Sequence, residues 1–375
     1  MREVVAVAGA VAQRPRRGGH AWVFLQYLLG FRRLGYEVLF LDRLTAEMLP
    51  PGSSPNGGAG WLRGTMEAQG LGEDFILLLD DGASIGLSRG EAIERLRRSV
   101  LLVDVMGFLG DGDLSEAAPR RLFLDIDPGF PQMWQQLGLH RSFGDHDAYA
   151  TVGLRVGKKE SRVPTCDVEW LPTPQPVVLE QWPRTPPGKA FTTVATWRGP
   201  FAPVDYQGER FGLRAHQMRA FAELPAAAGV PLQVALDIDE ADRDDEDLLR
   251  AGGWSIVSPQ DVAATADDYR GYVQNSRGEV SVAKDMYVRS RGGWLSDRSL
   301  CYLASGNPVL AQSTGYELEV ETGIGLLSFA TPAEAIVGLE EVEADYGRHS
   351  EAARELAREN FDSDRVLAKL LEAVA

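Results

Sequence analysis

The stretch Val4–Asp42, VVAVAGAVAQRPRRGGHAWVFLQYLLGFRRLGYEVLFLD, decides the fold class. It begins with an apolar run over residues 4–11, which predicts a buried strand. The loop QRPRRGGH follows, and apolar side chains then recur at helical spacing over Ala21–Phe31, until Gly35 ends the helix. The segment EVLFLD opens a second strand. A strand–loop–helix–strand unit of this kind predicts the start of a doubly wound α/β sheet.

The alternation of strands and helices then stops at a proline-rich segment and starts again after it. WLPTPQPVVLEQWPRTPPGK contains six prolines and little periodicity, which favours a linker. Further buried strands are predicted at Phe75–Leu79, Leu101–Val105 and Leu122–Ile126 before it, and the strand AFTTVATW opens the second half. We therefore predict the following parts: an N-terminal Rossmann-like domain (1–175), a linker (176–190), a C-terminal Rossmann-like domain (191–360) and a terminal helix (361–375).

Composition limits the kinds of partner that the protein can have. The chain has 375 residues, 44% of them hydrophobic, and a formal net charge of −16. Because nucleic-acid binding needs a basic field, this charge argues against a nucleic-acid partner. An anionic ligand would have to be held by local cations or by helix N-termini. The oligomeric state is not predictable from these numbers.

Cysteine usage and hydropathy bear on the compartment. Cys166 and Cys301 are far apart and form neither a disulfide framework nor a zinc spacing, which fits a reducing, cytoplasmic location. Glu3 lies where a signal peptide would be positively charged, so we interpret the first apolar run as a strand. No apolar run is long enough to predict a membrane span.

The segment Ser290–Leu310, SRGGWLSDRSLCYLASGNPVL, has the features of an anion site. Ser296 is a plausible N-cap, and Gly306 with the following Asn-Pro ends the helix. The preceding Gly292-Gly293 pair allows the backbone to come close to a ligand, and a helix N-terminus attracts phosphate. Two alternatives remain open: a purely structural helix with a tight turn, and an Asp297–Arg298 ion pair that only closes the helix start.

The sequence RGGWLSDRSLCYLASGNPVLAQSTG resembles the C-terminal domain of GT-B glycosyltransferases, in particular a bacterial glycosyltransferase-like subgroup. Segments such as FLDIDPGFPQMW, FTTVATWRG and ARENFDSDRVLAKLL spread the resemblance over most of the chain. It implies two Rossmann-like domains facing a central cleft, and transfer of a sugar from a nucleoside-diphosphate sugar to a hydroxyl of a small molecule, natural product or glycan. It implies no other cofactor and no metal. The residues that we expect to bind the donor are Arg198, Lys284, Arg291, Gly293, Ser296, Asp297, Arg298, Thr314 and Gly315.

Two departures from the family pattern keep other functions open. Many retaining members carry two glutamates eight positions apart around this helix, and the matching positions here are Gly293 and Cys301. Ser313 stands where the subgroup has Asp. A binding protein that has lost catalysis, or a nucleotide-sugar epimerase on the same fold, therefore remain as alternatives.

His20 is the predicted general base. It lies at the N-terminus of the first helix, where the helix dipole favours the neutral imidazole that a base requires. A carboxylate usually orients such a base, and Asp104, Asp125 and Asp127 follow apolar strands; we assign Asp127 to catalysis. The alternative is a histidine that merely caps the helix. The residues expected on the acceptor side are Gly18, Gly19, Pro128 and Gly129.

Other motifs carry less information. An Asp-x-Asp pattern occurs at Asp125/Asp127, but it recurs at Asp111/Asp113 and Asp237/Asp239 in this acidic chain, so we do not interpret it as a metal site. His146 lies between two aspartates and has no metal spacing. The arginine-rich loop RPRR could bind phosphate or could be a solvated surface.

Overall fold

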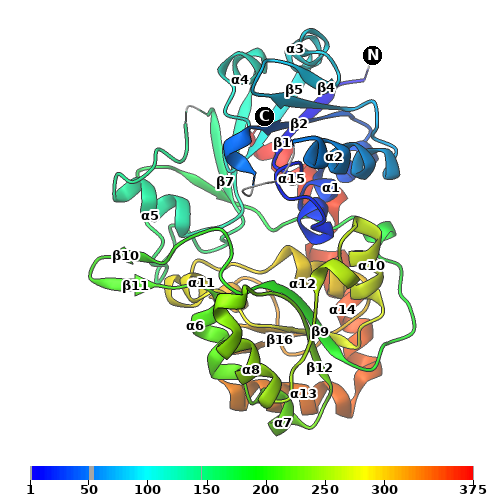
Figure 1. Cartoon of the computed structure of the whole chain (residues 1–375), viewed down its shortest axis with the longest axis vertical. Helices are drawn as coiled ribbons and strands as arrows, with labels where there is room; N and C mark the ends of the chain where they lie inside the picture. The colour runs from blue at the N-terminus through cyan, green and yellow to red at the C-terminus, as the bar shows by residue number, and fades with distance from the viewer. Residues whose placement is uncertain (1, 50–54, 145, 375) are drawn as a thin grey trace.

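The computed structural model describes residues 2–49, 55–144 and 146–374. Within these residues the chain forms two large sheets, each in its own half, and one two-stranded sheet, as Figure 1 shows. The N-terminal sheet has eight strands in the order β4-β3-β2-β1-β5-β6-β7-β8, parallel except for β4. The C-terminal sheet has six parallel strands in the order β13-β12-β9-β14-β15-β16. Both orders run outward from a central first strand, which confirms the predicted doubly wound α/β architecture.

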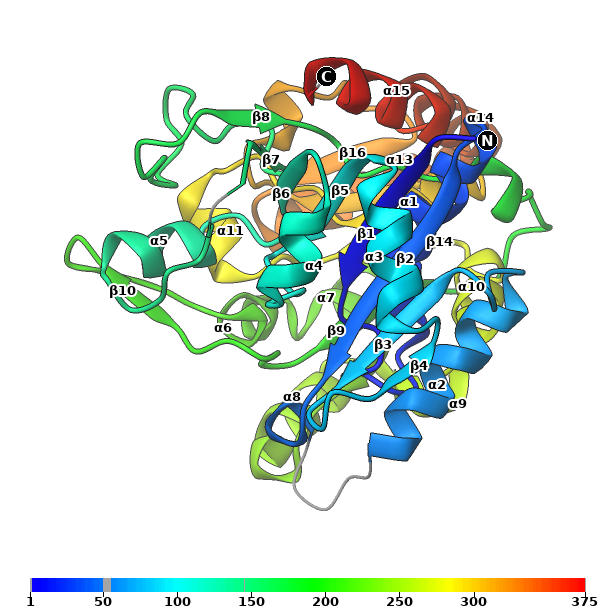
Figure 2. The same cartoon turned by 90° about the horizontal axis from the view of Figure 1, so that it is seen from above.

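The N-terminal half pairs a hydrophobic sheet with helices on its two faces (Figure 2). Its strands are β1 (Val4–Gly9), β2 (Glu37–Leu44), β3 (Phe75–Leu79), β4 (Ser84–Gly86), β5 (Ser99–Val105), β6 (Arg121–Asp125), β7 (Ala148–Thr151) and β8 (Trp170–Pro172). Its helices are α1 (Gly18–Arg33), α2 (Pro55–Ala68), α3 (Arg89–Arg97), α4 (Gly112–Ala117) and α5 (Phe130–Gln136).

The C-terminal half repeats this pattern and adds a small hairpin. Its sheet strands are β9 (Phe191–Thr196), β12 (Leu232–Asp237), β13 (Ser255–Val257), β14 (Gly278–Ser281), β15 (Val309–Gln312) and β16 (Leu326–Phe329), and the hairpin is β10 (Val204–Tyr206) with β11 (Glu209–Phe211). Its helices are α6 (Arg214–Met218), α7 (Leu224–Ala228), α8 (Arg243–Ala251), α9 (Pro259–Val262), α10 (Ala266–Gln274), α11 (Asp285–Ser290), α12 (Asp297–Ala304), α13 (Pro332–Ala344), α14 (Tyr346–Asn360) and α15 (Ser363–Val374).

Helix α1 joins the two halves, because it is apolar on nearly all sides. Trp22, Phe24, Tyr27 and Phe31 are all buried, so the helix contacts both its own sheet and elements of the second half. The Trp22 indole N–H donates to the carbonyl of Ala266 in α10 at 2.8 Å. The first residues of α1 are therefore fixed against the C-terminal domain.

The proline-rich segment is packed rather than free. Val177, Val178 and Trp182 are buried, and the backbone N–H of Val177 donates to Phe361 at 2.8 Å. After this point α15 lies against α1, so the end of the chain returns to the N-terminal half, as Figure 1 shows in red. The domain boundaries that we drew at 175, 190 and 360 stay a prediction.

The predicted strands at Phe75–Leu79, Leu101–Val105 and in the segment AFTTVATW are confirmed, and the Leu122–Ile126 strand is shifted by one residue. The short strands β7 and β8 and the hairpin were not predicted, because three or four residues carry too little periodicity. No helix among the described residues is both long and apolar enough to span a bilayer.

Gly18 tests the contact between the two halves. A Cβ at this position would lie 1.9 Å from the carbonyl oxygen of Thr265, which is backbone and cannot yield. We expect Gly18→Ala to lower the free energy of unfolding by about 1–3 kcal/mol, because α1 and α10 must separate. Gly64→Ala is the control: that glycine lies in α2 with open space around its Cβ, so it should be neutral or stabilise by about 0.5–1 kcal/mol. Denaturant unfolding measures both, and equal stability of Gly18→Ala and the wild type would contradict the contact.

Candidate functional site

A cavity of about 640 Å³ lies between the two halves of the chain. Its lining comes from the β1–α1 loop and the ends of β5 and β6 on one side, and from the ends of β9, β12 and β14 on the other. Ligands of doubly wound proteins bind at these carboxyl ends. Nine of the residues predicted for the site line this cleft: Gly18, Gly19, His20, Asp127, Arg198, Lys284, Ser296, Asp297 and Arg298.

The cleft is not acidic, although the protein is. The whole chain has 38 Lys and Arg against 54 Asp and Glu. Among the described residues that line the cleft, six are Arg or Lys and five are Asp. The cleft therefore provides the local positive charge that the net charge of −16 requires for an anionic ligand.

His20 is held as a neutral imidazole. Its Nε2 lies 2.9 Å from the carbonyl oxygen of Ala10, so Nε2 carries the proton and Nδ1 is left as the acceptor. Its ring packs edge-on against Phe24 at 5.2 Å between centroids. Burial, together with the nearby cations Arg14 and Arg17, lowers the pKa of His20 to about 4. A neutral imidazole facing the cleft has the protonation state of a general base.

Among the residues that the structure describes, no carboxylate bonds to His20, which differs from the expectation of an orienting carboxylate. Asp104 is paired with His146 at 3.3 Å, and Asp125 accepts from Thr151 at 2.7 Å. Asp127 is paired across the cleft, as described below. The backbone carbonyl of Ala10 takes the place of the expected carboxylate.

The β1–α1 loop is positioned by a buried carboxylate that the sequence analysis missed. Asp42, at the end of β2, accepts from the backbone N–H groups of Ala12 and Arg43, each at 2.7 Å. Burial raises the pKa of Asp42 to about 8. The predicted acceptor-side glycines are also contact residues: a Cβ at Gly19 would lie 2.7 Å from the Tyr269 ring.

Asp127 is one half of an ion pair between the two halves of the chain, and its assignment to catalysis stays a prediction. Its Oδ1 accepts from Lys284 Nζ at 2.7 Å and from the Tyr287 hydroxyl. Lys284 Nζ also lies 5.0–5.3 Å from the ring centroids of Tyr287, Phe130 and Phe201. The charge of Lys284 is thus paired with Asp127 in this structure, and its role at the donor phosphates stays a prediction.

Arg298 is a structural residue at the floor of the cleft. Its guanidinium forms a buried ion pair with Glu279 and donates to the carbonyl of Val194 and the hydroxyl of Ser281, each at 2.9 Å. The open alternative of an Asp297–Arg298 pair is wrong, because the partner of Arg298 is Glu279. The charge of Arg298 is therefore compensated within the protein.

The N-terminus of α12 faces the cleft through Ser296 and Asp297. Asp297 accepts from the backbone N–H of Arg298, and burial raises the pKa of the Asp297 carboxyl. A charged carboxylate at this place would repel a phosphate, and the raised pKa favours the neutral form; the donor-binding role of Asp297 stays a prediction. Ser296, whose hydroxyl makes only a weak 3.5 Å contact to Asp297, stays a candidate.

Arg198 and Arg17 are two cations of the cleft that each pair with an aspartate. Arg198 forms an ion pair with Asp242, and its side chain is 58% exposed in the cleft. Arg17 reaches across the cleft to Asp237 at 2.7 Å. Both pairs are solvent-accessible, so a ligand phosphate can compete for either guanidinium.

The remaining predicted residues lie behind the cleft. Arg291 pairs with Glu317 at 3.5 Å, and the N–H of Gly293 donates to Thr314 at 2.9 Å. These contacts join the α11–α12 loop to the loop after β15. The predicted residues that do not line the cleft are Arg291, Gly293, Thr314, Gly315, Pro128 and Gly129.

Arg214 is the cleft residue that sequence reasoning missed. It lines the cleft, its side chain is buried, and one nitrogen donates to the carbonyl of Val282. Its Nε has no partner, and no described carboxylate forms an ion pair with it. Burial, with Arg298 nearby, lowers the pKa of Arg214 to about 9. In the sequence it looks like an ordinary polar residue at the start of a helix.

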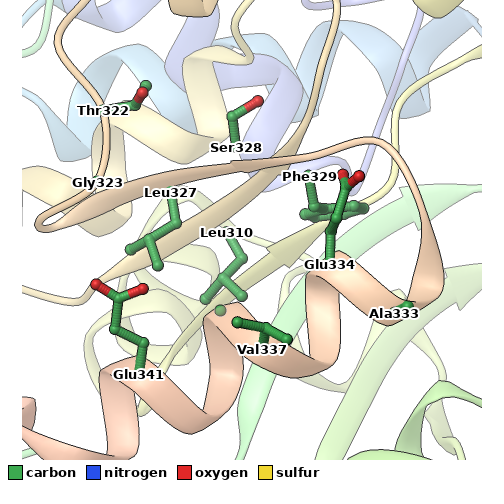
Figure 3. Close-up of a pocket in the computed structure, with 11 residues that line it drawn as sticks. Leu310, Thr322, Gly323, Leu327, Ser328, Phe329, Ala333, Glu334, Val337 and Glu341 are labelled. Atoms are coloured by element: carbon green, nitrogen blue, oxygen red, sulfur yellow. The ribbon is translucent and has the colours of Figure 1, made fainter.

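A second cavity, of about 440 Å³, lies between β16 and α13 and shares no lining residue with the cleft. Figure 3 shows its apolar floor, with Leu310 and Val337 between the carboxylates of Glu334 and Glu341. It contains none of the predicted residues. Among the described residues, no cluster of His, Cys, Asp and Glu could hold a metal ion.

No family model and no curated protein matches the chain, but solved structures do. Anabaena HepE in complex with UDP and glucose is 11% identical with a TM-score of 0.58, over 100% of this chain and 99% of that one. An alpha-glucosyltransferase in complex with UDP and a 13-mer DNA is 11% identical with a TM-score of 0.61, over 100% of both chains. AviGT4, a glycosyltransferase of avilamycin A biosynthesis, is 15% identical with a TM-score of 0.55, over 99% and 96%. The chain therefore has the GT-B glycosyltransferase fold, as predicted.

The Arg298–Glu279 pair gives a stability prediction. Arg298→Leu leaves Glu279 buried without its cation, so we expect the free energy of unfolding to fall by about 3–5 kcal/mol. Arg250→Leu breaks the exposed Arg250–Glu246 pair and should change it by no more than about 1 kcal/mol. Chemical denaturation compares the two, and equal losses would show that Glu279 does not depend on Arg298.

Proposed function

We propose that the protein is a glycosyltransferase that moves a sugar from a nucleoside-diphosphate sugar to an acceptor hydroxyl. The observation that carries this proposal is a buried arginine, Arg214, which forms no ion pair with a described residue and lies in a cleft between two doubly wound domains. The GT-B fold supports it, and so do the solved structures of similar fold that contain UDP. A small molecule, a natural product or a glycan would supply the hydroxyl.

Arg214 is assigned to the donor diphosphate. Burying a cation without an anion is unfavourable, and a phosphate that supplied the missing charge and hydrogen-bond acceptors would remove the penalty. Arg198 on the rim and the N–H groups at the start of α12 near Ser296 add to the same field. These groups would stabilise the charge on the departing nucleoside diphosphate, so the proposal needs no metal and no further cofactor.

His20 is assigned to the acceptor. In the proposed step, the acceptor hydroxyl gives its proton to Nδ1 of His20 as its oxygen bonds to the anomeric carbon. The bond from that carbon to the diphosphate oxygen breaks at the same time, and the nucleoside diphosphate leaves with the electron pair. A single displacement of this kind inverts the anomeric configuration.

The two positions that carry glutamates in many retaining relatives support this choice. A Cβ at Gly293 would lie 2.9 Å from Arg155, so no larger side chain fits there. Cys301 is buried and accepts a hydrogen bond from Gln26 at 3.7 Å, outside the cleft lining. No acid from these positions reaches the cleft, which argues against a mechanism that depends on the glutamate pair.

A panel of nucleoside-diphosphate sugars tests the proposal. A rise in melting temperature with one of them, together with slow release of free sugar, would support a transferase. A new sugar isomer would indicate an epimerase, and tight binding without turnover in any acceptor mixture would indicate a binding protein. If no member of the panel raises the melting temperature, the proposal fails.

Arg214→Met separates donor binding from stability. Because the variant removes a buried unpaired charge, the ligand-free protein should be no less stable than the wild type. Affinity for the nucleoside diphosphate should fall at least about tenfold, since hydrogen bonds to a charged group are lost. Isothermal titration calorimetry gives the affinity. Arg219→Met is the control, because Arg219 pairs with Asp245 outside the cleft lining and should leave binding unchanged. Unchanged affinity in Arg214→Met would remove it from the donor site.

His20→Ala tests the base. Loss of general-base catalysis should lower kcat by about 100-fold or more, with little change in donor affinity. In the wild type, the pKa of His20 of about 4 keeps the imidazole neutral at higher pH, so kcat/KM should stay level to below pH 6.5 and fall only near pH 4. His140→Ala is the control, because His140 is exposed and outside the cleft lining. Full activity of His20→Ala would exclude it as the base.

A further inference from the structure

The N-terminal wall of the cleft has a chemical character that the proposed activity does not explain. Its half-buried apolar side chains are those of Val23, Met106, Phe108 and Ile126. Beside them lies a short row of polar groups from the β1–α1 loop: Gln13, Arg14, Arg17 and His20. The N-terminal wall therefore has an apolar surface and, next to it, a positively charged surface.

Arg14 is the unpaired cation of this wall. Arg17 is neutralised by Asp237 at 2.7 Å, and Arg16, outside the cleft lining, donates to Gln260 at 2.8 Å. Arg14 forms no ion pair with any residue that the structure describes. The Arg14–Arg17–Asp237 group therefore carries one net positive charge. The side chain of Arg14 is exposed, so it is open to a ligand that enters the cleft. Partial loss of solvation and the adjacent Arg17 lower the pKa of Arg14, and the charge of Asp237 opposes that shift.

The apolar part of the wall is built at a conformational cost. Met106 has φ +56°, a left-handed conformation that side chains other than glycine rarely adopt. Its sulfur accepts from the N–H of Ile126 at 3.4 Å, which fixes both residues at the ends of β5 and β6. Strain that persists at the edge of a cleft is typical of a binding surface.

We propose that this wall binds an acceptor with an apolar, hydroxyl-bearing body and one carboxylate, and that Arg14 holds the carboxylate. A carboxylate matches the single uncompensated charge and the paired donors of a guanidinium. Arg14 is close enough to His20 to lower the pKa of its imidazole, so an acceptor held by Arg14 has its body beside the base. This inference rests on the proposed function and names the class of its acceptor.

Two probes of nearly equal size and shape, one anionic and one neutral, test it: 4-hydroxybenzoate and 4-hydroxybenzamide. Each is offered to the full-length protein saturated with the nucleoside diphosphate for binding, and with the donor selected by the panel for turnover. We expect the wild type to favour the acid by about tenfold or more in Kd and in KM. Arg14→Gln should abolish this preference, and Arg14→Lys should keep part of it, because a lysine retains the charge but not the paired donors.

Arg16→Gln is the matched control from the same loop and should keep the preference. Equal binding of acid and amide by the wild type would overturn the inference while leaving the proposed function intact, provided that the donor still binds. A loss of nucleoside-diphosphate affinity in Arg14→Gln, with the acid preference unchanged, would also overturn it and would place Arg14 at the donor instead. If no nucleotide sugar binds the wild type, it is the proposed function that fails.

Discussion

The contact between Gly18 and the backbone of Thr265 is the constraint on which the cleft depends. Gly18 has no side chain, so the first turn of α1 can lie directly against the start of α10. A Cβ at this position would lie only 1.9 Å from the carbonyl oxygen of Thr265. The N–H of Gly18 donates to Ala263 at 3.0 Å, so the contact also satisfies a helix N-terminal donor. This close approach brings the β1–α1 loop, with Arg14 and His20, to the edge of the second sheet. The glycines serve the arrangement of the domains, and through it the site.

Most cations of the cleft form an ion pair with a carboxylate, and each wall also has one cation that does not. Asp127 with Lys284 and Arg17 with Asp237 connect the two halves, while Arg298 is compensated by Glu279 within one half. Arg214 on the C-terminal wall and Arg14 on the N-terminal wall form no ion pair with a described residue. A diphosphate donor and an acidic acceptor would supply two separate anionic groups, one for Arg214 and one for Arg14.

The fold could be predicted from the sequence, because apolar periodicity and glycine positions act locally. The Val4–Asp42 unit is an example: its strands and helix follow from spacing within forty residues. The site could be predicted only in outline. Asp127 and Lys284 are 157 positions apart, so nothing in either local pattern shows that they neutralise each other. Arg214 has the opposite problem, since an arginine at the start of a helix is ordinary until burial makes it costly.

The uncompensated charge of Arg214 also has a consequence for the protein's lifetime. A protein with a buried unpaired cation is at its least stable when its cleft is empty, and a bound anion at 100 times its Kd adds about 2.7 kcal/mol. Proteases in a cell act on the unfolded fraction, which a change of that size alters by about two orders of magnitude. A cell that lacks the ligand would therefore degrade this protein faster than one that supplies it.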